Sequence, residues 1–174
     1  MNTNWPSMLS VLRAGPVAVL AVACSPVEAG QDAPAAASPA QTDSERHPIS
    51  GLEIGEVTVV SGDKRTPFKT EFALSRQAQT RGLMFRETLA DDEAMIFPND
   101  PPATRGFWMK NTPISLDIIF IDADRRIANI ETAVPYSLET VQSDGEVIAV
   151  FEIRGGLAAE LGIAPGDRVM WDMP

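Results

Sequence analysis

Alternating apolar and polar positions after residue 51 predict a domain made mainly of β-strands. Residues 56–60 and 68–74 are separated by a Ser-Gly-Asp-Lys turn, which predicts a hairpin. A second hairpin is expected from residues 116–121 and 127–132, which flank an Asp-Ala-Asp-Arg turn. Further strands are expected at residues 94–97, 106–110, 147–153 and 168–171.

Two short helices interrupt this pattern. Residues 75–81 are rich in Gln and Arg, begin with Ser75 as an N-cap and are followed by Gly82, which can end the helix. Residues 157–161, after a Gly-Gly pair, form the second predicted helix. The segment 98–105 contains three prolines and is expected to be an irregular loop, because proline cannot donate to a β-ladder.

These elements predict a compact, mainly β fold, an antiparallel β-sandwich or barrel with two short helices. A parallel strand pair needs a crossover of a dozen or more residues, and most connections in this chain are shorter. Residues 51–174 are numerous enough to bury one hydrophobic core. We therefore expect a single globular domain over this range, behind a separate N-terminal region.

The N-terminal region is similar to a bacterial secretory signal. Residues 1–23 carry one base, Arg13, followed by the apolar run 14–23, which is too short to span a bilayer. Cys24, the only cysteine, follows Leu-Ala-Val-Ala, which resembles a lipobox and implies a lipid anchor on a membrane. The alternative is cleavage after Ala23 and release into the periplasm. Both readings place the protein in the periplasm or on a membrane of the cell envelope.

Residues 24–50 predict a flexible linker. From residue 25 to residue 50 the chain has six Ala, four Pro and four Ser and almost no large apolar side chain, so it cannot bury enough surface to offset the entropy of ordering. His47, the only histidine, lies in this segment. Catalysis rarely depends on groups that nothing positions, so we expect no functional role for His47.

The charge balance excludes several classes of function. The chain has 24 acids and 14 bases and a net charge of −10, and residues 51–174 alone carry 20 acids and 12 bases. Binding to phosphate backbones depends on clusters of Lys and Arg, so nucleic acid is not an expected partner. A single Cys excludes an intramolecular disulfide. A single His excludes a zinc site or a proton relay built from several histidines within a monomer.

No metal and no cofactor is expected. The acidic turns 91–93 and 122–124 do not continue into the spacing of an EF-hand. Met84, Met95 and Met109 could ligate copper, but methionines on separate strands are more typical of core packing. The sequence also lacks a phosphate loop, a dinucleotide fingerprint and a nucleophile elbow, so it carries no enzyme signature.

Three motifs resemble one protein family. Gly-Leu-Met-Phe-Arg at residues 82–86, Met-Ile-Phe at 95–97 and the fourteen residues 107–120 are similar to the uncharacterised family known as domain of unknown function 192. The resemblance covers about residues 52–172. It implies a compact, mainly β fold that is often exported in bacteria, and it implies no established activity.

The longest of these motifs contains a candidate binding surface, Phe107–Thr112. Alternation along the expected strand places Trp108 and Lys110 on one face, so an aromatic ring and a cation lie together, with Asn111 beyond them. Such a mixture suits a small anionic or sugar-like ligand. The alternative is that Trp108 is a core residue with the Lys110 stem along it. The candidate ligand-binding residues are Arg81, Met84, Trp108, Lys110, Asn111, Thr112 and Asp117.

Two carboxyl groups fall inside apolar strands. Asp117 lies between Leu116 and Ile118, and Glu152 lies between Phe151 and Ile153. A carboxylate there is costly unless it is hydrogen-bonded or paired, so a structural role is favoured, with general acid or base chemistry as the alternative. The two can form a carboxylate pair only if their strands are neighbours.

Three functions remain as hypotheses. The leading one is an exported accessory or binding module of the cell envelope, which holds a small molecule, glycan or protein segment at Phe107–Thr112. The second is a hydrolase-like enzyme with Asp117 or Glu152 as general base. The third is a scaffold that binds peptides along a strand edge, because residues 156–167 resemble the helix-turn segment of PDZ domains.

Overall fold

Residues 45–174, which the computed structural model describes, form nine strands and two short helices. The strands are β1 (Ile54–Ser61), β2 (Lys64–Phe72), β3 (Glu93–Ala103), β4 (Gly106–Phe107), β5 (Leu116–Ile121), β6 (Ile127–Ala133), β7 (Val141–Gln142), β8 (Val147–Arg154) and β9 (Arg168–Trp171). The helices are α1 (Arg76–Arg81) and α2 (Leu157–Leu161). The prediction of a mainly β domain with two short helices is confirmed, as are both hairpins, β1–β2 and β5–β6.

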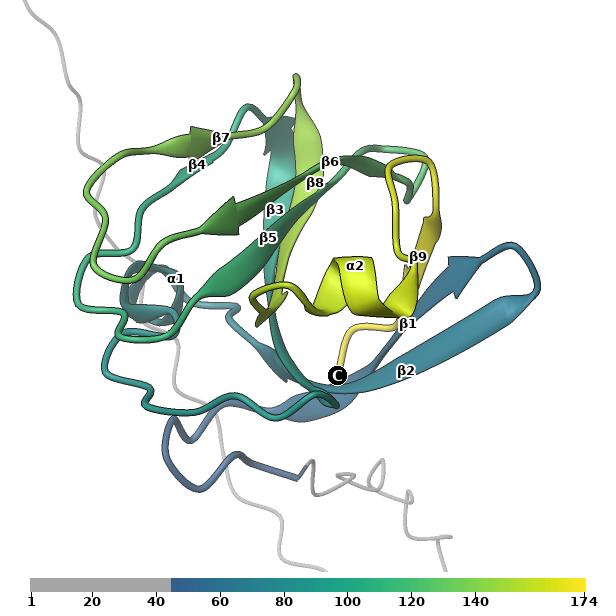
Figure 1. The fold of residues 1–174 in the computed structure, drawn as a ribbon. Helices are drawn as coiled ribbons and strands as arrows, with labels where there is room; N and C mark the ends of the chain where they lie inside the picture. The colour runs from purple at the N-terminus through teal and green to yellow at the C-terminus, as the bar shows by residue number, and fades with distance from the viewer. Residues whose placement is uncertain (1–44) are drawn as a thin grey trace, which may run out of the picture. The chain divides into compact units, whose positions relative to one another are not determined.

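Seven of the strands form one mixed sheet in the order β6-β5-β8-β3-β2-β1-β9, and β4 and β7 form a separate pair (Figure 1). The prediction of an antiparallel sheet is wrong at one place, because β2 and β3 are parallel. Residues 73–92, which contain α1, connect these two strands, and they are numerous enough to make the crossover that a parallel pair requires. The prediction relied on the shortness of most other connections, and those connections do not determine how β2 and β3 pair.

The barrel alternative is also wrong, although the two edge strands approach each other at one end. An isolated bridge joins Arg126 to Arg168, and the Ile127 amide donates to Asp167 at 2.9 Å. No continuous ladder between β6 and β9 follows among the described residues. The sheet is therefore strongly curved but not closed.

Two strands differ from their predicted lengths. β3 runs through the prolines of the expected loop 98–105, with an irregular register against β8 between Pro98 and Ala103. The Asn99 side chain donates to the Val147 carbonyl at 2.9 Å, so it supplies a bond where the ladder is interrupted. The predicted strand 106–110 is only two residues long, because β7 is equally short and offers no longer partner.

The interior strand β8 contributes to two apolar cores, one on each face of the sheet. Phe151 and Ile153 belong to a buried cluster shared with β1, β2, β9 and α2. Val150 belongs to a second cluster with Phe97 and Phe120. Glu152 shares the face of this second cluster, since it lies directly opposite Met95 of β3 and Ile118 of β5.

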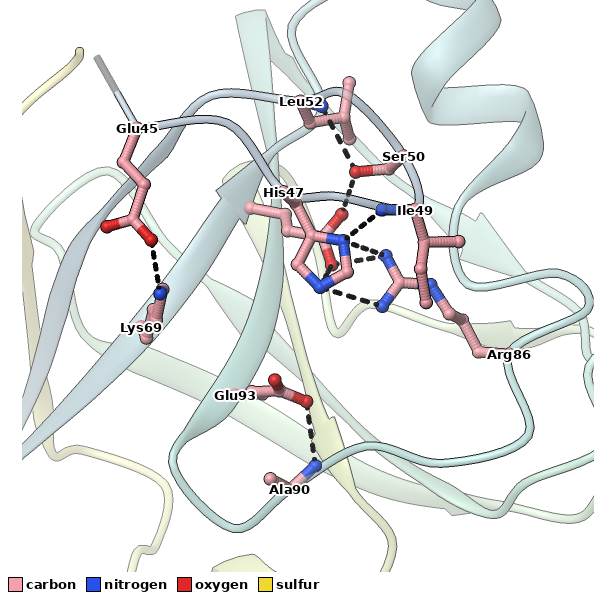
Figure 2. A network of polar contacts seen from close by, with 10 residues as sticks. Glu45, His47, Ile49, Ser50, Leu52, Lys69, Arg86, Ala90 and Glu93 are labelled. Atoms are coloured by element: carbon pink, nitrogen blue, oxygen red, sulfur yellow. Dashed lines mark hydrogen bonds and ion pairs between the residues drawn. The ribbon is translucent and has the colours of Figure 1, made fainter.

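A buried polar network holds residues 45–50 against the domain. Arg86 donates to Glu71 at 2.5 Å, and its guanidinium nitrogens lie 3.2 and 3.4 Å from the ring nitrogens of His47 (Figure 2). The Ser50 hydroxyl donates to the other oxygen of the Glu71 carboxylate and accepts from the Leu52 amide at 3.1 Å.

The expectation that nothing positions His47 is therefore wrong. Its side chain is only 12% exposed, and Nε2 lies 3.7 Å from Glu71. Composition alone did not indicate this, because the groups that hold His47 lie in β2 and in the segment after α1. Residues 1–23, Cys24 and the predicted linker up to residue 44 lie outside the described residues. None of the helices within residues 45–174 has the length and apolar character needed to cross a bilayer.

We predict that Arg86→Ala destabilises the protein by about 3–5 kcal/mol, because it leaves the Glu71 carboxylate buried without its cation. Arg46→Ala is the matched control, because it removes an exposed ion pair with Glu53 and should cost less than about 1 kcal/mol. Urea unfolding of the two variants measures both values. Equal effects of the two substitutions would contradict a structural role for the network.

Candidate functional site

A cleft of about 470 Å³ opens on the face of the sheet that carries Glu152. We call it the Trp108 cleft. Residues of α1 and of 82–84, residues 105–109, and side chains of β3, β5 and β8 line it. The crossover between β2 and β3 and the segment around β4 therefore build one site over the second apolar core.

Trp108 lines this cleft and is 49% exposed, so it is not a core residue. Its neighbour Met109 is 2% exposed and belongs to the second core, so the expected alternation holds although the strand ends at Phe107. The ammonium of Lys110 lies 5.2 Å from the centroid of the Trp108 ring, within the range of cation–π contacts. The predicted grouping of an aromatic ring and a cation is thus present at the cleft.

The turn after Trp108 fixes the backbone beside the cleft. Asn111 has a φ of 58°, and its carbonyl accepts from the Phe85 amide at 2.8 Å. Phe85 also has a positive φ, of 65°, which is unusual for a bulky residue. The Thr112 amide donates to the Met109 carbonyl at 3.1 Å, and the Thr112 side chain lines the cleft.

Three guanidinium groups line the Trp108 cleft, those of Arg76, Arg81 and Arg105. None of them forms an ion pair with a carboxylate of residues 45–174, whereas Arg46, Arg86 and Arg154 do. The cleft is therefore a local concentration of positive charge in a domain where acids outnumber bases.

Glu152 is the one acid among the described residues that line the cleft. Its side chain projects from β8 among Met95, Ile118 and Leu116, and the residue is 5% exposed. Burial raises the pKa of Glu152 to about 8, because the surrounding side chains solvate the charged form poorly. Glu152 is therefore largely protonated at neutral pH and can donate one hydrogen bond and accept others.

Asp117 faces the opposite side of the sheet. It pairs across the sheet with Ile153, so its side chain lies toward the first core. Its carboxylate accepts from the Thr132 hydroxyl at 2.7 Å and from the amides of Gly156 and Ala158, each at 2.9 Å. Gly156 can present its amide in this way because it has a φ of +84°. Asp117 thus fixes the turn into α2, and it forms no carboxylate pair with Glu152 although β5 and β8 are neighbours.

The structure brings together some of the residues expected from the sequence. Arg81, Met84, Trp108 and Thr112 line the cleft, together with Glu152. Lys110 and Asn111 contact lining residues, since the Asn111 amide nitrogen lies 3.9 Å from the Met84 sulfur. Asp117 does not line the cleft. The PDZ-like segment 156–167 contains α2, and Leu157 and Ala158 of α2 are buried in the first core.

Sequence reasoning did not identify several lining residues, among them Arg76, Gln79 and Arg105. Gln79 accepts from Arg105 at 3.4 Å and donates to the Pro98 carbonyl at 2.8 Å, so it links α1 to both segments. The available signal was the spacing of Arg76 and Gln79, which places both on one face of a helix. Nothing in the sequence around Arg105 indicated that its side chain contacts Gln79 of α1. No group of three or more metal-ligating side chains was found within residues 45–174.

Comparisons with known proteins identify the family. The model of the DUF192 family, described as "Uncharacterized ACR", matches residues 57–171. A crystal structure of a protein of unknown function from Novosphingobium aromaticivorans DSM 12444 is 49% identical, with a TM-score of 0.72, covering 75% of this chain and 94% of that one. A crystal structure from Sinorhizobium meliloti 1021, described as a candidate transcription regulator, is 32% identical, with a TM-score of 0.66. The match covers 68% of this chain and 94% of that one.

A comparison with curated proteins finds no match. The family match extends from β1 to β9 and so includes every strand of the sheet. The chain is a member of the DUF192 family, as its motifs indicated.

We predict that the free energy of unfolding falls by several kcal/mol as the pH rises from about 5 to 8. Glu152 ionises near its ordinary pKa of 4.5 in the unfolded chain but only near 8 in the folded one, so the unfolded state binds fewer protons over this range. Urea unfolding at a series of pH values measures the slope. Glu152→Gln, which stays neutral, should remove this contribution, and an unchanged slope in that variant would contradict it.

Proposed function

We propose that this protein is an accessory or binding module that holds a small ligand in the Trp108 cleft. The observation that carries this proposal is a half-exposed tryptophan beside a concave site with three guanidinium groups and one buried carboxyl. Ligand sites combine apolar walls with a few convergent polar groups in this way. The Phe107–Thr112 surface supplies one wall, and α1 supplies most of the polar groups.

An exposed tryptophan is better explained by binding than by stability. A core role would require burial of the ring, whereas about half of the Trp108 surface remains accessible. The residues around it are fixed by the buried Met109 and by the Phe107 ring, which packs edge-on against Phe97 at 5.1 Å. Trp108 is thus held on a rigid support, which reduces the entropy that a ligand has to overcome on binding.

The place of this module in the cell is part of the proposal. Residues 14–24 support export, and the Leu-Ala-Val-Ala-Cys sequence supports a lipid anchor at Cys24. The acidic charge of the domain gives no attraction to an anionic membrane surface, so the anchor supplies the membrane contact. The module acts on ligands present in the periplasm.

A second candidate function is a hydrolase-like activity with Glu152 as the acid or base. A buried carboxyl in a cleft, with a pKa raised to about 8, is in the range that proton transfer at neutral pH requires. The two-carboxylate mechanism of most glycosidases, however, needs a second acid in the same cleft, and Asp117 lies on the other side of the sheet. A binding function therefore explains Trp108 and the three arginines as well as Glu152, whereas hydrolysis explains Glu152 alone.

We predict that Trp108 fluorescence reports ligand binding in the full chain. Titration with inorganic phosphate, succinate, glucuronate and N-acetylglucosamine should give a saturating change for at least one compound. The change should vanish in Trp108→Phe and persist in Trp171→Phe, because Trp171 lies on β9 with the Arg125 guanidinium over its ring.

Calorimetry separates this role from a structural one. Trp108→Ala should weaken binding about fivefold, given the roughly 1 kcal/mol that an aromatic contact contributes, without lowering the melting temperature. Leu138→Ala removes another exposed apolar side chain and should change neither value. A Trp108→Ala variant that loses several degrees of melting temperature, or a chain whose Trp108 responds to no compound, would contradict the proposed site.

We predict that Cys24→Ala moves the protein from the membrane fraction to the soluble periplasmic fraction. Two acyl chains on Cys24 would hold it on a membrane, and the substitution removes their attachment point. Cell fractionation and immunoblotting measure the distribution. A wild-type protein found entirely in the soluble periplasm would support simple release after Ala23, and one that stays in the cytoplasm would contradict export.

A further inference from the structure

We propose that the Trp108 cleft selects small organic anions, binding a carboxylate or phosphate group through Arg76, Arg81 and Arg105, with Glu152 as a further hydrogen-bonding partner in the cleft. This inference rests on the proposed binding function and specifies its ligand class. Four features of the described residues support it.

The first feature is that none of the three arginines forms an ion pair with a carboxylate of residues 45–174. In residues 45–174, the ion pairs use Arg46, His47, Lys69, Arg86 and Arg154, and none reaches the cleft. Arg65, Arg125, Arg126 and Arg168 also lack an ion pair within residues 45–174, but they do not line the cleft. Three such groups around one cleft leave donors that an external anion can use.

The second feature is the shape of the donors. A guanidinium group presents paired N–H groups that match the two oxygens of a carboxylate or phosphate. Arg105 is held in place, because its side chain donates to Gln79 at 3.4 Å and lies 5.8 Å from the centre of the Phe107 ring. A donor that is already positioned loses less conformational entropy when the anion binds.

The third feature is the state of Glu152, the one acid among the described residues that line the cleft. An ionised Glu152 would repel an anion, but burial raises its pKa to about 8, so below that pH the group is neutral. The other charged groups that line the cleft are the three arginines, from α1 and from the segment before β4, and Lys110 lies beside Trp108. No second carboxylate among the described lining residues offsets these cations.

The fourth feature is the apolar part of the cleft. Leu83, Phe97 and Leu116 line it, so an occupant needs a carbon skeleton as well as its charged group. Free inorganic phosphate satisfies the arginines but leaves these side chains uncovered. An organic anion therefore fits better than an inorganic one.

The test compares compounds that share one ring and differ in charge. Isothermal titration calorimetry of the full chain with glucose, glucuronate and glucose 6-phosphate separates a neutral ligand from a carboxylate and a phosphate. Succinate is an anion with a carbon chain and inorganic phosphate is an anion without one, so the pair tests whether the carbon skeleton contributes to binding. We expect at least one organic anion to bind at least tenfold more tightly than glucose and than inorganic phosphate.

The arginine variants locate the interaction. Arg81→Ala, Arg76→Ala and Arg105→Ala should each weaken binding of that anion about tenfold or more, because hydrogen bonds to charged groups are the strong ones. Arg65→Ala is the matched control, since Arg65 is an exposed arginine on β2 that does not line the cleft. Binding should also weaken as the pH rises above about 8, and this alkaline loss should be absent in Glu152→Gln, because its side chain stays uncharged at every pH.

The outcomes are distinct. If Trp108 responds to neutral compounds as strongly as to anions, or if Arg65→Ala weakens binding as much as Arg81→Ala does, anion selection is wrong while the binding function stands. If no compound of the series changes Trp108 fluorescence or gives a calorimetric signal at millimolar concentration, both fail. If Glu152→Gln leaves the alkaline loss unchanged, the assigned role of Glu152 is wrong.

Discussion

A carboxyl group in a strand that is buried on both faces has to be either hydrogen-bonded or neutral, and this constraint shapes the whole domain. Asp117 and Glu152 occupy adjacent strands, and the pleat directs them to opposite faces of the sheet. Asp117 meets the constraint with three donors, two of which come from the turn into α2. Glu152 meets it by protonation beside a cleft. One strand pair therefore has one side that fixes the turn into α2 and another side that lines the cleft.

The site depends on the single parallel strand pair. A parallel pair requires the chain to cross a face of the sheet, and the crossover between β2 and β3 brings α1 over the second core. The arginines of α1 then line the same cleft as Glu152 of β8, which is an interior strand of the sheet. The buried Arg86 and Glu71 anchor the end of this crossover to β2, so stability and ligand geometry share one segment.

Local features of the fold could be predicted from the sequence, and features set by distant pairing could not. The hairpins β1–β2 and β5–β6 depend on alternating apolar residues and on a turn, and both features can be recognised in the local sequence. The parallel pairing of β2 with β3 depends on which strands meet after a crossover of twenty residues. The candidate site followed the same division. Trp108 belongs to a recognisable motif and Arg81 to a predicted helix, whereas Arg105 reaches Gln79 from 26 residues away. His47 was misjudged for that reason too, because its partners are remote.

The pairing of the first strand with the last has a consequence for how the chain reaches its folded state. β9 pairs with β1, so Val57 and Trp171 are neighbours in space although more than a hundred residues separate them. The sheet cannot gain this edge until the final residues have been synthesised, and such distant contacts slow folding. A polypeptide that threads through a translocation channel has to remain unfolded until it has passed. The late pairing of β1 with β9 is compatible with the export proposed above, because the sheet stays incomplete until synthesis ends.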